Sequence, residues 1–158
     1  MTIRPETYFR ERLWPSAWIY LALALVIPAS ALVFLPINQV VGSITGVVLY
    51  LACAGLFTLT APVVTVTDSG VTAGRASLPV AMVGETKAFA GADATLQRGQ
   101  LLDARAWLVI RGWIDPVVRL EVVDESDPTP YWIISTRRPA EFVSAIERAR
   151  SGPAAQVG

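Results

Sequence analysis

A long stretch without charge constrains this chain more than any other feature. From Leu13 to Thr67, about 55 residues contain no Asp, Glu, Lys or Arg, whereas one bilayer crossing needs only about 20 apolar residues. A signal peptide has a single apolar core of about 7–15 residues, which is far shorter than this run. The alternative is a buried helical hairpin of a soluble protein, but the roughly 90 residues after Thr67 are too few to cover such a hairpin. The stretch therefore predicts two membrane-spanning helices.

The first predicted span covers residues 17–35, and Pro28 should kink it because proline removes a helical hydrogen bond. The second span covers residues 40–61 and ends at Pro62. The connection between the spans is short, so the two helices should be antiparallel neighbours.

Gly42 and Gly46 form a Gly-x-x-x-Gly pair in the second predicted span. Small residues allow two helix backbones to approach closely in lipid. The simpler use of the pair is packing against the first span. The other use is a face for a homodimer or for a membrane-protein partner.

The basic residues around the two spans predict their orientation. Arg4, Arg10 and Arg12 precede the first span, and the turn at residues 36–39 contains no Lys or Arg. Lys and Arg are enriched on the cytoplasmic side of membrane proteins. We therefore expect a multi-pass protein of the cell (plasma) membrane with both termini in the cytoplasm.

Composition excludes several classes of function. The chain has 13 basic and 13 acidic residues, so it lacks the basic excess that nucleic-acid binding requires. Histidine is absent and Cys53 is the single cysteine. These absences remove the commonest general base and metal ligand and any zinc site built on several cysteines. We expect no cofactor, no metal site and no nucleic-acid partner.

The remainder of the chain predicts a small β domain. Its expected strands are residues 63–67, 71–73, 77–83, 106–110, 117–123 and 131–135, with a short helix from about Asp93. Pro139 opens a closing helix whose apolar stripe is Phe142, Val143, Ile146 and Ala149. Short strands followed by one helix fit a small antiparallel barrel or sandwich in the order of a pleckstrin-homology-like domain.

The predicted fold class is therefore an α+β membrane protein. Residues 1–62 form an N-terminal cytoplasmic segment and the transmembrane helical hairpin. Residues 63–150 form the cytoplasmic β-rich domain, and residues 151–158 form a tail.

Three segments carry a resemblance to a known family. They are Asp127 to Pro139 (DPTPYWIISTRRP), Asp103 to Trp107 (DARAW) and Arg111 to Ile114 (RGWI). The chain resembles, over nearly its whole length, a family of uncharacterised actinobacterial membrane proteins with two N-terminal spans and a C-terminal pleckstrin-homology-like domain. The resemblance implies a domain of unknown function and supplies no catalytic residues.

The sequence contains no convincing set of catalytic residues. Ser135 and Thr136 have no neighbouring base to activate them, so Thr136 more simply serves hydrogen bonding at the entry of the closing helix. Asp124, Glu125 and Asp127 match no complete calcium loop and are interpreted as solvated charges. No Gly-x-x-x-x-Gly-Lys-Ser/Thr motif for phosphate binding occurs.

The arginines are the remaining candidates for a site. Arg137 and Arg138 are adjacent, and Arg105 and Arg111 lie in or beside an earlier strand. If folding gathers them, they could contact an anionic lipid headgroup or the carboxylates of a partner. Ion pairing with scattered acidic residues is the simpler alternative.

These features predict a non-enzymatic, membrane-tethered scaffold or accessory subunit at the inner leaflet, in contact with the lipid bilayer. The alternative is a module that binds anionic lipids or headgroups. A lipid-modifying enzyme is the least favoured class.

Overall fold

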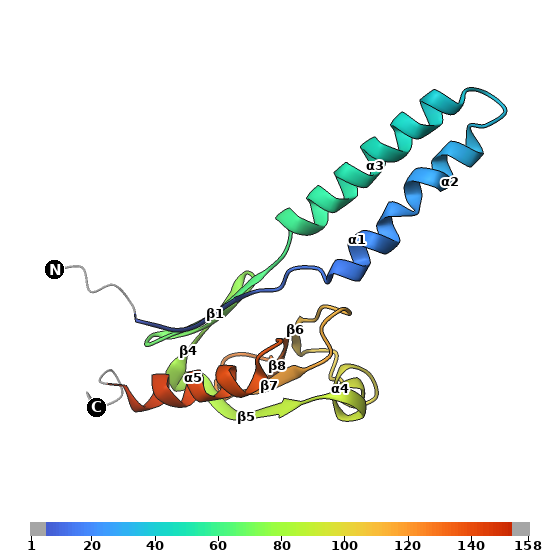
Figure 1. Ribbon diagram of the computed structural model, residues 1–158. Coiled ribbons are helices and arrows are strands. Elements are labelled where there is room, and N and C mark those ends of the chain that lie inside the picture. Colours follow the sequence, from blue (N-terminus) through green and yellow to red (C-terminus); the bar gives the residue numbers. More distant parts are fainter. Residues whose placement is uncertain (1–5, 153–158) are drawn as a thin grey trace. The chain divides into compact units, whose positions relative to one another are not determined.

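The computed structural model describes residues 6–152, which fall into two units (Figure 1). One unit is helical and runs from Trp14 to Ala61; the other contains the described residues up to Leu13 and those from Pro62 onward. The expected boundary at residue 62 lies next to the observed one, between Ala61 and Pro62. The expectation that the N-terminal segment groups with the helices needs correction, because this segment belongs with the β strands. Arg4 and the tail from Pro153 lie outside the described residues.

The helical unit contains α1 (Ala17–Ala24), α2 (Val26–Val33) and α3 (Gln39–Leu59). Within the described residues, α3 is the one helix long and apolar enough to cross a membrane. The first predicted span is shorter than expected and is broken at Leu25, ahead of the expected kink at Pro28. Pro28 cannot donate to the carbonyl of Ala24, and the lost bond disrupts the preceding turn.

The three helices form a hairpin in which α1 and α2 run alongside α3 (Figure 1). The side chain of Asn38 accepts hydrogen bonds from the backbone N–H groups of Val40 (2.9 Å) and Val41 (3.3 Å). This cap starts α3 directly after the turn. Near the open end of the hairpin, the Tyr20 hydroxyl lies 3.0 Å from Thr58 Oγ1.

The first sheet of the β unit has the order β1-β2-β3-β4, and all its pairs are antiparallel. Its strands are β1 (Thr7–Arg12), β2 (Val63–Thr67), β3 (Gly70–Ala73) and β4 (Ala76–Pro79). Arg12 pairs with Val63, and the Leu13 N–H donates to the Pro62 carbonyl at 2.9 Å. The whole helical unit is thus an insertion in the connection between two paired strands.

The second sheet has the order β5-β7-β8-β6. Its strands are β5 (Val83–Phe89), β6 (Trp107–Val109), β7 (Val117–Val122) and β8 (Tyr131–Ser135), and a 3-10 turn at Val80–Met82 precedes β5. The expectation of wholly antiparallel strands is wrong at β6, which runs parallel to β8. Helix α4 (Gly91–Arg98) lies between β5 and β6 in the chain. After it, residues 99–106 cross to the edge of the sheet opposite β5, where β6 enters beside β8 in the same direction.

Two apolar clusters explain why every residue of β8 is buried. Trp132 and Ile134 face the main core, which includes Phe142 of the C-terminal helix α5 (Pro139–Ser151). Tyr131 and Ile133 face the opposite cluster, which contains Ala94 of α4. Strand β8 is therefore covered on both faces.

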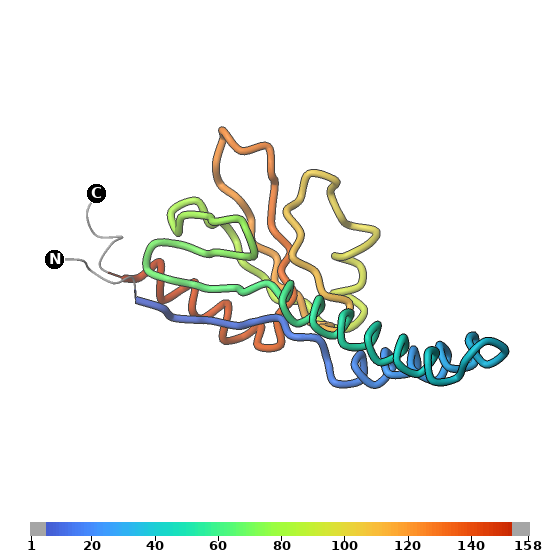
Figure 2. The backbone as a smooth tube through the Cα atoms, turned by 90° about the horizontal axis from the view of Figure 1, so that it is seen from above, coloured from blue at the N-terminus to red at the C-terminus, as the bar shows by residue number. Residues whose placement is uncertain are grey.

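Helix α5 also packs on the first sheet. It lies beside β1 in the view from above (Figure 2). The rings of Phe9 and Phe142 meet edge to face, with their centroids 5.2 Å apart. The protein is therefore a mixed α+β structure with mainly antiparallel sheets and one long apolar helix.

Candidate functional site

Arg137 lies against a buried carboxylate in β1. Glu11 is only 7% exposed, and its Oε2 accepts a hydrogen bond of 2.5 Å from Thr136 Oγ1. Its Oε1 accepts from the Arg137 N–H at 3.1 Å and lies 3.9 Å from Arg137 Nη1. We call Glu11, Thr136 and Arg137 the β1 seam, because they join β1 to the segment between β8 and α5.

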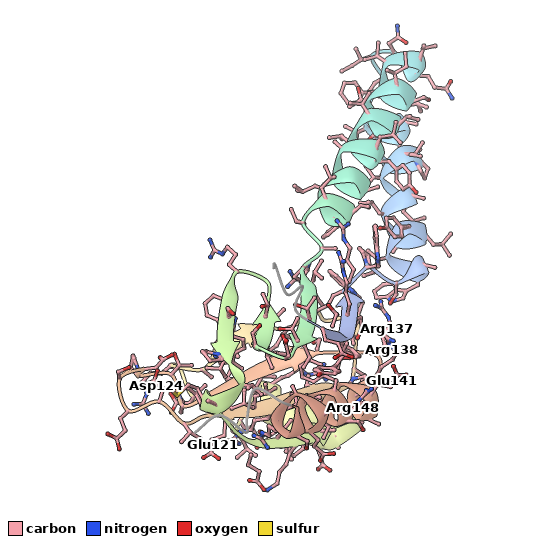
Figure 3. The ribbon with its side chains drawn as sticks, turned by 90° about the vertical axis from the view of Figure 1, so that its left-hand side faces the viewer. Glu121, Asp124, Arg137, Arg138, Glu141 and Arg148 are labelled. Atoms are coloured by element: carbon pink, nitrogen blue, oxygen red, sulfur yellow. The ribbon has the colours of Figure 1, made fainter. Side chains whose placement is uncertain are left out.

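Arg138 adds further contacts beside this seam (Figure 3). Its Nη1 donates to Glu141 Oε2 at 3.0 Å, and its Nη2 donates to the Arg10 carbonyl at 2.9 Å. Its guanidinium carbon also lies 4.7 Å from the centre of the Phe9 ring. Both adjacent arginines thus fasten the fold internally.

The other two candidate arginines have separate local partners. Arg105 Nη2 lies 3.1 Å from Asp103 Oδ2, and hydrogen bonds from Arg105 lower the pKa of the Asp103 carboxyl. The Arg111 N–H donates to Ser135 Oγ at 3.0 Å, and its Nη1 donates to the Ile110 carbonyl at 2.8 Å. These contacts favour internal pairing over one gathered arginine site.

Ser135 and Thr136 are fully buried and hydrogen-bonded, which makes neither hydroxyl accessible as a nucleophile. Thr136 Oγ1 also accepts from the Arg138 N–H at 3.1 Å, so it contributes to the start of α5. Arg138 itself occupies the N-cap position, where no side chain caps the helix.

Asp124 and Asp127, in the acidic loop between β7 and β8, accept hydrogen bonds from neighbouring residues of the same loop. Asp124 Oδ1 accepts from the Ser126 hydroxyl (2.6 Å) and N–H (2.9 Å), and these bonds lower the Asp124 pKa. Asp124 lies on the side of the β unit away from Arg137 and Arg138 in Figure 3. Within residues 6–152, no group of three or more acidic or cysteine side chains could hold a metal ion.

Gly42 and Gly46 face α2 within the helical hairpin. A Cβ atom added at Gly42 would lie 2.7 Å from Phe34 Cβ, and one at Gly46 would lie 2.8 Å from Ile27 Cα. Real Cβ atoms do not approach neighbours this closely. The two glycines therefore allow α3 to pack directly on the backbone of α2.

A polar pocket of about 380 Å³ lies between β5, β7 and α4. We call it the β5–β7 pocket, and its lining residues are Glu85, Lys87, Phe89, Gln97, Arg119 and Glu121. The sequence analysis predicted the strand at residues 117–123, which contains Arg119 and Glu121, but not β5. The alternation in residues 85–89, where Glu85, Lys87 and Phe89 share a face, is the signal that was available for this strand.

Arg119 is the central side chain of this pocket. Its Nη1 donates to Gln97 Oε1 at 3.2 Å, and its guanidinium carbon lies 3.9 Å from the centre of the Tyr131 ring. In the described part of the chain, no carboxylate lies within ion-pair distance of Arg119. Lys87, by contrast, pairs with Glu85 at 2.9 Å.

Together these features define a mixed α+β protein in which an apolar helical unit connects the paired strands β1 and β2. Residues 8–146 match the family model described as "Protein of unknown function (DUF3093)", and the chain belongs to this family. The expected resemblance to an uncharacterised family is thereby confirmed. Neither the curated proteins nor the solved structures contain a match to the chain.

Proposed function

We propose that the protein is an integral membrane protein whose helical unit crosses the cell membrane twice. The pairing of β1 with β2 carries this proposal. Both strands belong to one sheet, so Leu13 and Pro62 must lie on the same side of any bilayer. If α3 crosses the membrane, the segment from Trp14 to Asn38 must cross it as well. A single crossing would break the sheet.

The surface of the helical unit supports this assignment. Large apolar side chains project outward all along it; Ile37 is 78% exposed and Leu59 is 80% exposed. No charged residue lies between Leu13 and Thr67. Contiguous apolar surface of this extent requires cover, and lipid supplies it without any partner.

The orientation that we propose places both termini and the β unit in the cytoplasm. Arg10 and Arg12 precede α1, and Arg75 lies in the turn that adjoins Val63 through the bond from the Gly74 N–H. The connection between α2 and α3 contains no Lys or Arg. This distribution follows the enrichment of basic residues on the cytoplasmic side.

We further propose that the β unit is pleckstrin-homology-like. Four antiparallel strands in sequence order are followed by the antiparallel strands β5, β7 and β8 and then by α5. This order supports the proposal, while the parallel strand β6 is an addition to it.

For its activity, we propose a non-enzymatic scaffold or accessory subunit. The burial of both candidate hydroxyls supports a role without catalysis. The alternative, binding of anionic lipid headgroups by the four arginines, is less favoured because each arginine already has an internal partner. A lipid-modifying enzyme remains the least favoured class.

Cysteine labelling in intact cells tests the proposed topology. In a Cys53→Ser background, Asn38→Cys should react with a membrane-impermeant maleimide added outside. The matched control is Ser126→Cys in the exposed acidic loop, which should react only after the cells are opened. Reaction of Asn38→Cys only after lysis would refute the two crossings in this orientation.

Purification in mild detergent tests the scaffold role separately. The full chain, expressed at its natural level, should copurify with a partner in fixed stoichiometry. Recovery of the protein alone as a monomer would contradict the scaffold role while leaving the topology intact.

A further inference from the structure

Like charges lie opposite each other across β5 and β7. The register pairs Lys87 with Arg119 directly. Glu85 and Glu121 also line the pocket, where the Glu85 backbone N–H donates to Glu121 Oε2 at 3.4 Å. Like charges in directly opposite positions destabilise a sheet, whereas opposite charges stabilise it. A local arrangement that weakens the fold is expected where function requires it.

Lys87 and Arg119 form the basic half of the β5–β7 pocket, and Arg119 is oriented to bind an anion. Gln97, which is 7% exposed, accepts a hydrogen bond from one Arg119 nitrogen. The Arg119 guanidinium also stacks on the face of the Tyr131 ring. These contacts fix the orientation of Arg119, while its other N–H groups have no carboxylate partner in the described residues. Arginine in a fixed orientation suits bidentate binding of a carboxylate or phosphate.

Glu85 and Glu121 form the acidic half of the pocket, and each lies two residues from the basic residue of its own strand. Residues i and i+2 of a strand are separated by about 7 Å on the same face. The pocket therefore presents a cationic pair and an anionic pair at this separation. Its volume of about 380 Å³ lies in the range of sites for small molecules.

We propose that the β5–β7 pocket binds a small zwitterion that carries a carboxylate or phosphate group at one end and an ammonium group at the other. Arg119 and Lys87 bind the oxyanion. Glu85 and Glu121 bind the ammonium group, and Phe89 contacts the apolar segment that joins the two charged groups. Without ligand, Lys87 pairs with Glu85 at 2.9 Å on the exposed surface. Binding exchanges this exposed pair, which stabilises the fold little, for contacts with the ligand at both ends.

Calorimetric titration of the full chain in detergent micelles tests this site. The probes are the zwitterions O-phosphoethanolamine and 4-aminobutyrate. Inorganic phosphate, acetate and ethanolamine, which carry charge of one sign only, are the controls. At least one zwitterion should bind about tenfold more tightly than any control, because each control meets only one charged half. The better zwitterion identifies the oxyanion as phosphate or carboxylate.

Two variants connect binding with the proposed residues. Lys87→Gln should weaken zwitterion binding about tenfold and leave the melting temperature nearly unchanged, because it removes both the exposed ion pair with Glu85 and the like charge opposite Arg119. Arg105→Gln, which changes an exposed arginine paired with Asp103, is the matched control and should bind normally. A purely structural role of Lys87 would not separate binding from stability in this way.

Three results would overturn the proposal. The first is the absence of binding of either zwitterion at millimolar concentration. The second is a phosphate or acetate affinity equal to that of the zwitterions. The third is unchanged binding by Lys87→Gln.

Discussion

The β1 seam predicts a large loss of stability when Thr136 is replaced by valine. Valine has nearly the same volume, so the change removes the hydroxyl without opening a cavity. The hydroxyl donates to the Glu11 carboxylate at 2.5 Å and accepts from the Arg138 N–H at 3.1 Å. A hydrogen bond to a charged group contributes about 1.5–3 kcal/mol, and a neutral one about 0.5–1.5 kcal/mol. We expect Thr136→Val to lower the free energy of unfolding by about 3 kcal/mol.

Urea unfolding of the detergent-solubilised chain measures this loss. Trp107 and Trp132 lie in the β unit, and their fluorescence should follow the unfolding of its core. Thr136→Ser keeps the hydroxyl and is the matched control, with an expected loss below about 1 kcal/mol. In a Glu11→Gln background, Thr136→Val should cost less, because the charge that strengthens the bond is gone. A loss below about 0.5 kcal/mol for Thr136→Val alone would refute the reasoning.

Three further predictions follow from individual contacts. Gly46→Ala should destabilise the helical hairpin in detergent by about 1–3 kcal/mol through overpacking, whereas Gly55→Ala, which meets no atom within 4 Å, should be neutral or slightly stabilising in thermal unfolding followed by circular dichroism. Tyr131→Phe removes the hydroxyl that bridges the backbone of residues 101 and 103, so hydrogen exchange of residues 99–106 should accelerate. Ser126→Ala should raise the Asp124 pKa towards its ordinary value, as measured by NMR titration. Because the fold lowers this pKa, the stability that Asp124 contributes is present at neutral pH and is lost as the pH falls through the folded pKa. An unchanged Asp124 titration would show that Ser126 does not cause the shift.

Segments with strong local patterns could be predicted from the sequence. The β-branched run at Val63–Thr67 forms β2, and the apolar run at Tyr131–Ser135 forms β8. Pro139 begins α5, whose apolar stripe is buried as expected at Phe142 and Ile146. In each case the signal lies within about ten consecutive residues, so no distant partner is needed to read it.

The candidate site depended on contacts that no local pattern contains. The arginines at 137 and 138 suggested a ligand site, but their partners Glu11 and Arg10 lie in β1, far away in the sequence. The opposition of Lys87 and Arg119 likewise follows from the register of β5 on β7. Charge partners across a sheet are fixed by pairing, and pairing over long separations is not encoded in either strand alone.

Residues 13–67 can be identified as an uncharged apolar segment without any structure, because charge and hydropathy are properties of consecutive residues. That this segment is an insertion within a sheet becomes visible only in the long-range pairing of β1 with β2. The segment Thr7–Arg12 contains three charged residues and reads as a polar flank of the first helix. It becomes a strand because β2, beyond the helical unit, supplies the hydrogen-bonding edge and α5 covers Phe9. Because β1 and β2 pair directly, the two ends of the apolar segment must lie on the same side of any membrane that the segment enters.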